Sequence, residues 1–95
     1  MRAREKSAIV DAVGDRAEVY LDGGVRSGAD IVAAVAFGAR AVLVGRAFLY
    51  GLMAGGERGV QRSADILAVE AKRTMQLLGV TSVAGLGRHH VRLRP

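Results

Sequence analysis

Several residue types are scarce in this sequence, and each shortage excludes a class of protein. The chain has no cysteine, which excludes a disulfide framework and a thiolate metal site. The absence of cysteine is also typical of proteins in a reducing cytoplasm. Aromatic residues make up 4% of the sequence, with no tryptophan, which leaves few platforms for stacking single-stranded nucleic acid. No apolar run approaches the roughly 18–20 residues that span a bilayer, and the charged start over residues 1–6 leads into no secretory signal. We therefore expect a cytoplasmic protein without a transmembrane segment, and leave peripheral association with a membrane open.

Positive charge is concentrated at the two ends of the chain. The formal net charge is +5, yet residues 7–87 contain eight basic and eight acidic side chains. The excess comes from the two ends: Arg2, Arg4 and Lys6 against Glu5 give +2, and Arg88, Arg92 and Arg94 give +3. A neutral body has no basic face that could follow a phosphate backbone, and short basic ends are typical of solvated tails. We therefore expect no nucleic-acid partner, and a basic tail over residues 88–95.

The chain is long enough for one small domain and apolar enough to require burial. It has 95 residues, of which 51% are hydrophobic. Apolar spacing and glycine stops predict helices over 5–13, 29–37, 47–53 and 57–78, and short strands over 18–21 and 41–44. Ser27, with Asp30 three residues later, is similar to a capping box at the start of the second helix. Gly55-Gly56 predicts a break between the last two helices.

Two strands connected by a helix predict one right-handed βαβ unit with a parallel sheet. The tetrad Ala41-Val42-Leu43-Val44 is apolar without alternation, which is typical of a strand buried on both faces. Two strands cannot cover both faces of a sheet, nor hide the apolar surface of the neighbouring helices. We therefore expect an α/β fold in which residues 1–95 form a single partial domain, either a fragment or one partner of an assembly.

A glycine-rich loop follows each predicted strand at its carboxyl end, where parallel α/β folds bind ligands. The candidate site residues are Asp22, Gly23, Gly24, Val25 and Arg26 in the first loop, and Gly45 and Arg46 in the second. Adjacent glycines let backbone amides approach an oxyanion, arginine binds two of its oxygens, and a helix N-terminus adds partial positive charge. Each loop alone is equally typical of a turn or a solvated surface, but together they predict a shared phosphate site.

Candidates for catalysis and metal binding are few. His89 and His90 are adjacent, so their side chains are expected to point apart, and no suitably spaced carboxylates lie nearby. We therefore expect a solvated pair and no metal site. Tyr20 and Tyr50 are interpreted as packing groups. No arrangement of serine, histidine and aspartate, and no carboxylate pair, indicates a general base, so no residue is assigned a catalytic role.

Three motifs carry a resemblance to a known family. The stretches D-G-G-V-R-S-G over 22–28, V-L-V-G-R over 42–46 and Y-G-L over 50–52 resemble the C-terminal part of the FMN-dependent α-hydroxy acid dehydrogenases, the family of glycolate oxidase and L-lactate dehydrogenase (cytochrome). The similarity covers about residues 8–87. It implies the C-terminal portion of a TIM (β/α)8 barrel, with strands 7 and 8 and their helices. It also implies FMN as the cofactor, bound by the candidate site residues through its phosphate and ribityl chain.

The resemblance implies an oxidoreductase that converts small 2-hydroxy acids, such as L-lactate, to 2-oxo acids. In the family, a histidine takes the proton of the substrate while the flavin accepts a hydride equivalent. The S-N-H-G-G-R-Q-like stretch that carries this histidine and a substrate-binding arginine has no counterpart in residues 1–7. We therefore expect the chain alone to be inactive, and to act as a homo-oligomer or with a missing N-terminal barrel portion.

Two alternatives stay open at this point. IMP dehydrogenase-like barrels use a similar D-G-G phosphate loop, although Arg46 and the sequence Tyr50-Gly51-Leu52 favour the flavin family. A non-catalytic phosphate-binding or assembly protein would keep the phosphate site without any redox chemistry. Flavin spectra of the chain, with and without an upstream barrel segment, distinguish these alternatives.

Overall fold

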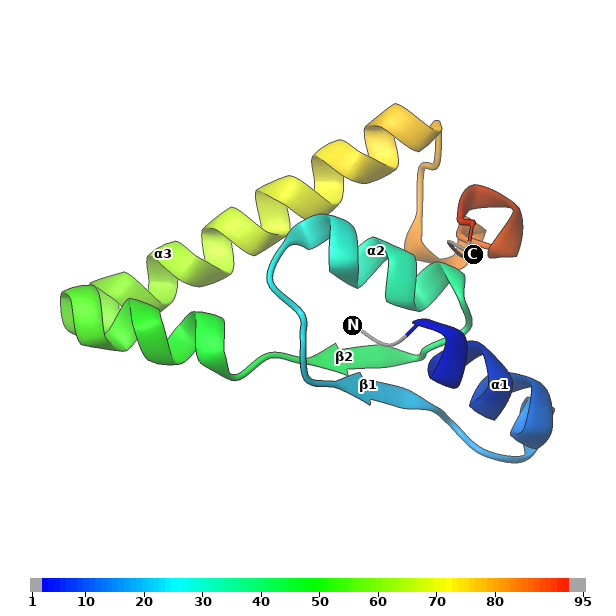
Figure 1. Cartoon of the computed structure of the whole chain (residues 1–95). Coiled ribbons are helices and arrows are strands. Elements are labelled where there is room, and N and C mark those ends of the chain that lie inside the picture. The colour runs from blue at the N-terminus through cyan, green and yellow to red at the C-terminus, as the bar shows by residue number, and fades with distance from the viewer. Residues whose placement is uncertain (1–2, 93–95) are drawn as a thin grey trace.

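The computed structural model describes residues 3–92 of the chain (Figure 1). Its elements in order are helix α1 (Ala3–Val13), strand β1 (Tyr20–Asp22), helix α2 (Gly28–Ala36), strand β2 (Ala41–Leu43) and helix α3 (Arg46–Leu78). Single 3-10 turns lie at Gly14–Arg16, Val83–Gly85 and Arg88–His90. The predicted order of helices and strands is therefore confirmed, with each strand shorter than predicted.

The two strands form a parallel pair connected by α2. Tyr20 lies opposite Ala41 and Asp22 lies opposite Leu43, so both strands end at the same level. Figure 1 shows α2 above one face of this pair, with the longer arm of α3 beside it. The predicted βαβ unit is confirmed in its order and in its parallel pairing.

The buried core lies between the sheet and α2. Leu21, Val25, Ala34 and Ala39 form a buried cluster, against which Ile31, Val42 and Val44 pack. The other side of the sheet is uncovered, because Tyr20 and Leu43 are 51% and 56% exposed. Apolar side chains on α3 are exposed as well, including Met53, Val69 and Leu77. This uncovered surface agrees with the expectation that two strands cannot bury what the chain presents.

The start of α2 is fixed by reciprocal hydrogen bonds. The Asp30 amide donates to the Ser27 hydroxyl at 3.2 Å, and the Asp30 carboxylate accepts from the Arg26 amide at 3.0 Å. The predicted capping interaction of Ser27 with Asp30 is confirmed. The return bond reaches one residue further upstream than in the usual capping box, so it orders the end of the first loop as well as the helix.

Helix α3 consists of two arms that meet at a kink. Gly55 and Gly56 have non-helical backbone angles, and Gly56 lies in the positive-φ region at 61°. The predicted break is therefore confirmed. The two arms approach so closely that a Cβ atom on Gly59 would clash with the carbonyl of Gly51. The Ser63 hydroxyl joins them further, since it donates to the Ala47 carbonyl at 3.3 Å.

The end of the chain folds back toward α1. Gly79 ends α3 in the left-handed region, and Arg88 forms an ion pair with Asp11 at 2.6 Å. As far as residue 92, the segment predicted as a solvated tail therefore contacts the body; residues 93–95 lie outside the described part of the chain. The expectation that His89 and His90 point apart is wrong, because their ring centroids lie 3.9 Å apart within a 3-10 turn.

The described part of the chain offers neither a membrane-spanning helix nor a cluster of metal ligands. Within residues 3–92, no helix is both long and apolar enough to cross a membrane. The same residues contain no group of three or more histidine, cysteine, aspartate or glutamate side chains placed to hold a metal ion.

Candidate functional site

The two predicted loops meet at one edge of the sheet. Because β1 and β2 are parallel and end at the same level, their carboxyl ends lie side by side. The loop of residues 23–27 leaves β1, and Val44 and Gly45 connect β2 to Arg46 at the start of α3. The fold therefore brings together two segments that are about 20 residues apart in the sequence.

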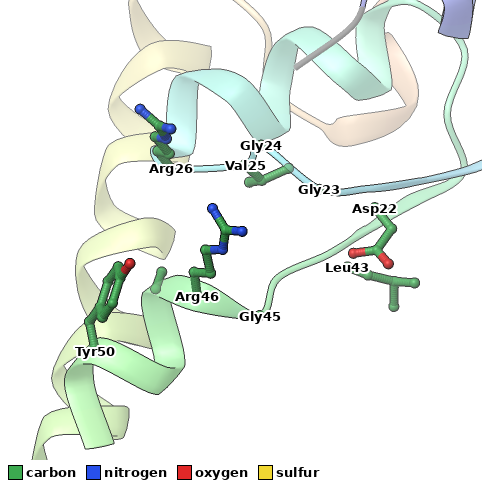
Figure 2. A pocket seen from close by; sticks show the side chains of 10 residues that line it. Asp22, Gly23, Gly24, Val25, Arg26, Leu43, Gly45, Arg46 and Tyr50 are labelled. Atoms are coloured by element: carbon green, nitrogen blue, oxygen red, sulfur yellow. The ribbon is translucent and has the colours of Figure 1, made fainter. Parts of the chain in front are cut away.

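A cavity of about 660 Å³ opens between these loops (Figure 2). Its lining contains all seven residues predicted for the site, namely Asp22, Gly23, Gly24, Val25, Arg26, Gly45 and Arg46. Leu43, Ala47 and Tyr50 complete the lining. Sequence reasoning had treated Tyr50 as a packing group, yet it is 62% exposed. The missed signal was helical spacing, since Tyr50 lies four residues after Arg46 and therefore on the same face of α3.

Glycine is required in the first loop and leaves open space in both. Gly23 and Gly24 have φ angles of 90° and 76°, a region that residues with a side chain rarely adopt. A Cβ atom on Gly23 or Gly45 would meet no heavy atom within 4 Å, so neither position is filled by packing. Backbone groups at these positions are accessible to a ligand from the cavity.

Arg26 and Arg46 contribute two unpaired positive charges to the lining. Both are exposed, and neither guanidinium has a hydrogen-bond or ion-pair partner within residues 3–92. Figure 2 shows the Arg46 side chain directed toward the loop of Gly24 and Val25, whereas the Arg26 side chain points away from Arg46. The structure thus brings both residues to one cavity without bringing their guanidinium groups together. The Asp22 carboxylate lies beside Leu43, away from Arg46.

Three of the first four amides of α2 already have acceptors. The Gly28 amide donates to the Glu70 carboxylate at 3.2 Å, and the Ile31 amide donates to the Ser27 carbonyl at 3.3 Å. The Asp30 amide is occupied by the Ser27 hydroxyl. The helix N-terminus therefore offers the cavity chiefly its dipole, which is the contribution that the sequence analysis expects of it.

A second cavity, of about 580 Å³, lies at the opposite end of the strands and has a different chemistry. Two of its charged side chains interact with each other, because Arg40 lies 4.0 Å from Glu18. The Tyr20 hydroxyl donates to the Glu18 carboxylate at 2.5 Å, and this hydrogen bond is the main cause that raises the pKa of Tyr20. Unpaired cations and open glycines occur together at the carboxyl ends of the strands, which is where barrel enzymes place their ligands.

Sequence comparison relates the chain to flavin enzymes. Residues 4–93 match the family model of the FMN-dependent dehydrogenases. The chain is 52% identical over 84 residues to an L-lactate dehydrogenase of Caulobacter vibrioides, covering 88% of this chain and 22% of that protein. It is 51% identical over 83 residues to the pre-mycofactocin synthase of Mycobacterium tuberculosis, covering 87% of this chain and 21% of that protein. The chain thus spans about a fifth of the length of these curated relatives.

Solved structures agree with this relation. An (S)-mandelate dehydrogenase superposes with a TM-score of 0.90 at 37% identity, covering 97% of this chain and 26% of that one. A mandelate oxidase variant with an FMN adduct gives a TM-score of 0.84 at 43% identity, covering 88% of this chain and 27% of that one. The expected fold, the C-terminal portion of a TIM (β/α)8 barrel, is therefore confirmed. The chain belongs to the FMN-dependent dehydrogenase family, whose cofactor is FMN.

Proposed function

We propose that this chain anchors FMN in an oxidoreductase that oxidises small 2-hydroxy acids, such as L-lactate, to 2-oxo acids. The observation that carries the proposal is the pair of unpaired arginines on one glycine-lined cavity at the carboxyl ends of parallel strands. The site comprises Asp22, Gly23, Gly24, Val25, Arg26, Gly45 and Arg46. L-Lactate dehydrogenase and (S)-2-hydroxyacid oxidases among the relatives support the substrate class.

The residues of the cavity fit the phosphate end of FMN. Arg46 is already directed toward the first loop, and the exposed Arg26 side chain reaches the same space by rotation about its own bonds. Two guanidinium groups match the charge of a phosphate dianion, and each binds its oxygens in a planar fork. Asp22 accepts hydrogen bonds from ribityl hydroxyls. When bound, FMN supplies the acceptor for the hydride equivalent.

The reaction needs a proton acceptor, a role that the resemblance gives to a histidine, and the lining of this cavity contains no histidine. The two histidines of the chain, His89 and His90, are absent from its lining. The chain therefore contributes cofactor binding and orientation rather than acid–base chemistry. We propose that further strands of the barrel cover the exposed Tyr20 and Leu43 face and bring the acid–base residues to the site, with a homo-oligomer as the alternative partner.

Flavin binding tests the proposal directly. The chain is titrated with FMN, riboflavin and inorganic phosphate, alone and as a complemented barrel, meaning the 95-residue chain co-purified with the upstream part of the Caulobacter L-lactate dehydrogenase. We expect FMN to bind to the complemented barrel more tightly than riboflavin, with quenched flavin fluorescence, and 2-hydroxy acid oxidation only there. Phosphate binding without flavin binding would instead indicate a non-catalytic phosphate-binding protein. FMN that stays unbound in both preparations overturns the proposal.

A further inference from the structure

We propose that Glu70 is a positioning residue that fixes the FMN-phosphate loop against α3. The inference deepens the proposed function and rests on it. Glu70 lies outside the cavity lining, 42 residues after the loop it contacts. Its role follows from three contacts that connect the two sides of the cavity.

The first contact is a hydrogen bond to the start of α2. The Gly28 amide donates to Glu70 Oε1 at 3.2 Å in a partly buried position. Gly28 directly follows the loop segment that contains Arg26 and Ser27. A carboxylate at a helix N-terminus is stabilised both by this hydrogen bond and by the helix dipole. Glu70 therefore holds the end of the loop at a defined point on α3.

The second contact is the close packing of the two helices at the same point. A Cβ atom on Gly28 would clash with the backbone nitrogen of Ala71 and with Glu70 itself. The absence of a side chain at position 28 therefore brings the α2 backbone within reach of the Glu70 carboxylate. Close packing and the hydrogen bond act on the same residue, so a change in either one displaces the loop.

The third contact joins the two arms of α3, and so connects the arm that carries Glu70 to the other side of the cavity. Glu70 lies on the long arm of α3, and Arg46 begins the short arm. The arms are joined by the Gly51–Gly59 contact and by the hydrogen bond from Ser63 to the Ala47 carbonyl. Through this helical hairpin, the loop that carries Arg26 is held at a fixed place relative to Arg46. Figure 1 shows the long arm of α3 beside α2, and the short arm beside the start of the long arm.

Three substitutions separate the position of the carboxylate from its charge. Glu70→Gln keeps an acceptor oxygen at the same reach without the charge, whereas Glu70→Asp keeps the charge and withdraws it by one methylene. Glu70→Ala removes both. If Glu70 positions the loop, the glutamine variant loses only the contribution of the charge and stays close to the parent, whereas the aspartate and alanine variants no longer hold the loop. Glu57→Ala is the matched control, since Glu57 is an exposed glutamate of the same helix without a hydrogen-bond or ion-pair partner among residues 3–92.

Amide hydrogen exchange of the full 95-residue chain, without flavin, is the first measurement. We expect exchange at Gly28 and over residues 23–27 to become roughly tenfold faster in Glu70→Asp and Glu70→Ala, to change much less in Glu70→Gln, and to stay unchanged in Glu57→Ala. Should Glu70→Ala fail to fold, the exchange rates of Glu70→Asp and Glu70→Gln are compared with each other, and this comparison tests the inference. An unprotected Gly28 amide in the parent chain, or an aspartate variant identical to the parent, overturns the inference.

FMN affinity of the complemented barrel is the second measurement. We expect a roughly tenfold weaker FMN affinity in Glu70→Asp, restored in Glu70→Gln, with little change in riboflavin affinity. Loss of FMN and riboflavin affinity in equal proportion would indicate general damage and overturn the positioning role. If the parent itself binds no FMN while the exchange pattern holds, the proposed function fails and the Glu70 contact stands.

Discussion

The glycines at the cavity and those at the helix crossings are used in opposite ways. Gly23 and Gly45 face open space, with no heavy atom within 4 Å of a hypothetical Cβ. Gly28, Gly51 and Gly59 are so crowded that the same atom would clash with backbone. One set leaves room for a ligand, and the other lets helices approach each other. The same residue type therefore leaves open space at one end of the loop and permits close packing at the other.

This difference separates two kinds of mutational effect. A side chain at a crowded glycine has to displace backbone, which costs stability throughout the chain. A side chain at an open glycine displaces only solvent or a ligand, and at Gly45 the φ angle of −114° tolerates any residue. Substitutions at the crowded glycines should thus lower the stability of the fold, whereas substitutions at the open glycines should lower the affinity for flavin.

The largest effect is expected for Gly59→Ala. Alanine favours a helix by about 1 kcal/mol over glycine, but its methyl group would overlap the Gly51 carbonyl. Because backbone cannot move aside as a flexible side chain does, we expect a net loss of about 2–3 kcal/mol or more. Urea unfolding of the complemented barrel, followed by circular dichroism, measures it.

Gly45→Ala is the control for this prediction. Its unfolding midpoint should match the parent, while FMN affinity falls because the methyl group enters the cavity. Equal unfolding midpoints for Gly59→Ala and Gly45→Ala would contradict the distinction between crowded and open glycines.

The next effect in size is expected for the cavity arginines. Arg46→Ala should weaken FMN binding by roughly ten- to a hundredfold, the usual consequence of losing a charge-assisted interaction. Arg26→Ala should have a smaller effect, because its side chain points away from Arg46 and has to rotate before both can bind one phosphate. Flavin fluorescence titrations of the complemented barrel measure both. Riboflavin affinity should stay nearly constant, and so should FMN affinity in Arg62→Ala, a control on the exposed surface of α3. An Arg46→Ala variant with parental FMN affinity would contradict the phosphate site.

Much of the fold could be predicted because glycine reports local backbone geometry. The predicted stops at Gly14, Gly38 and Gly79 all have positive φ angles, where glycine is favoured over other residues. The kink at Gly55-Gly56 was predicted for the same reason. These backbone conformations depend on one or two residues, so they can be predicted from the local sequence without knowledge of the rest of the chain.

The candidate site was predictable where it depended on strand ends and unpredictable where it depended on distant contacts. Parallel strands place their carboxyl ends together, so the residues of both loops could be assigned to one site from the sequence alone. Glu70 could not be assigned, because its partner Gly28 lies 42 residues away and nothing local to either residue indicates the other. Side-chain direction was equally inaccessible, which is why the divergence of Arg26 from Arg46 emerged only from the structure.

A smaller effect is expected at the cap between the open and the crowded glycines. Ser27→Ala removes the acceptor of the Asp30 amide, and loss of such a cap typically costs about 1 kcal/mol. Ser82→Ala is a matched control, since Ser82 precedes a 3-10 turn without any side-chain capping bond. Urea unfolding should distinguish the two variants. Identical midpoints would mean that the Ser27 hydroxyl contributes no net stability.

The smallest effect is expected for the ion pair that lies outside both sets of glycines. Arg88 and Asp11 are 2.6 Å apart, but their side chains are 48% and 62% exposed. Exposed ion pairs typically contribute about 0–1 kcal/mol, because solvent screens the charges and two side chains lose freedom. A double-mutant cycle with Arg88→Ala and Asp11→Ala should therefore give a coupling energy within this range, and raising the salt concentration should reduce it further. A coupling energy that exceeds this range and does not change with salt would show that the C-terminal turn is held to α1 as firmly as α2 is held to α3.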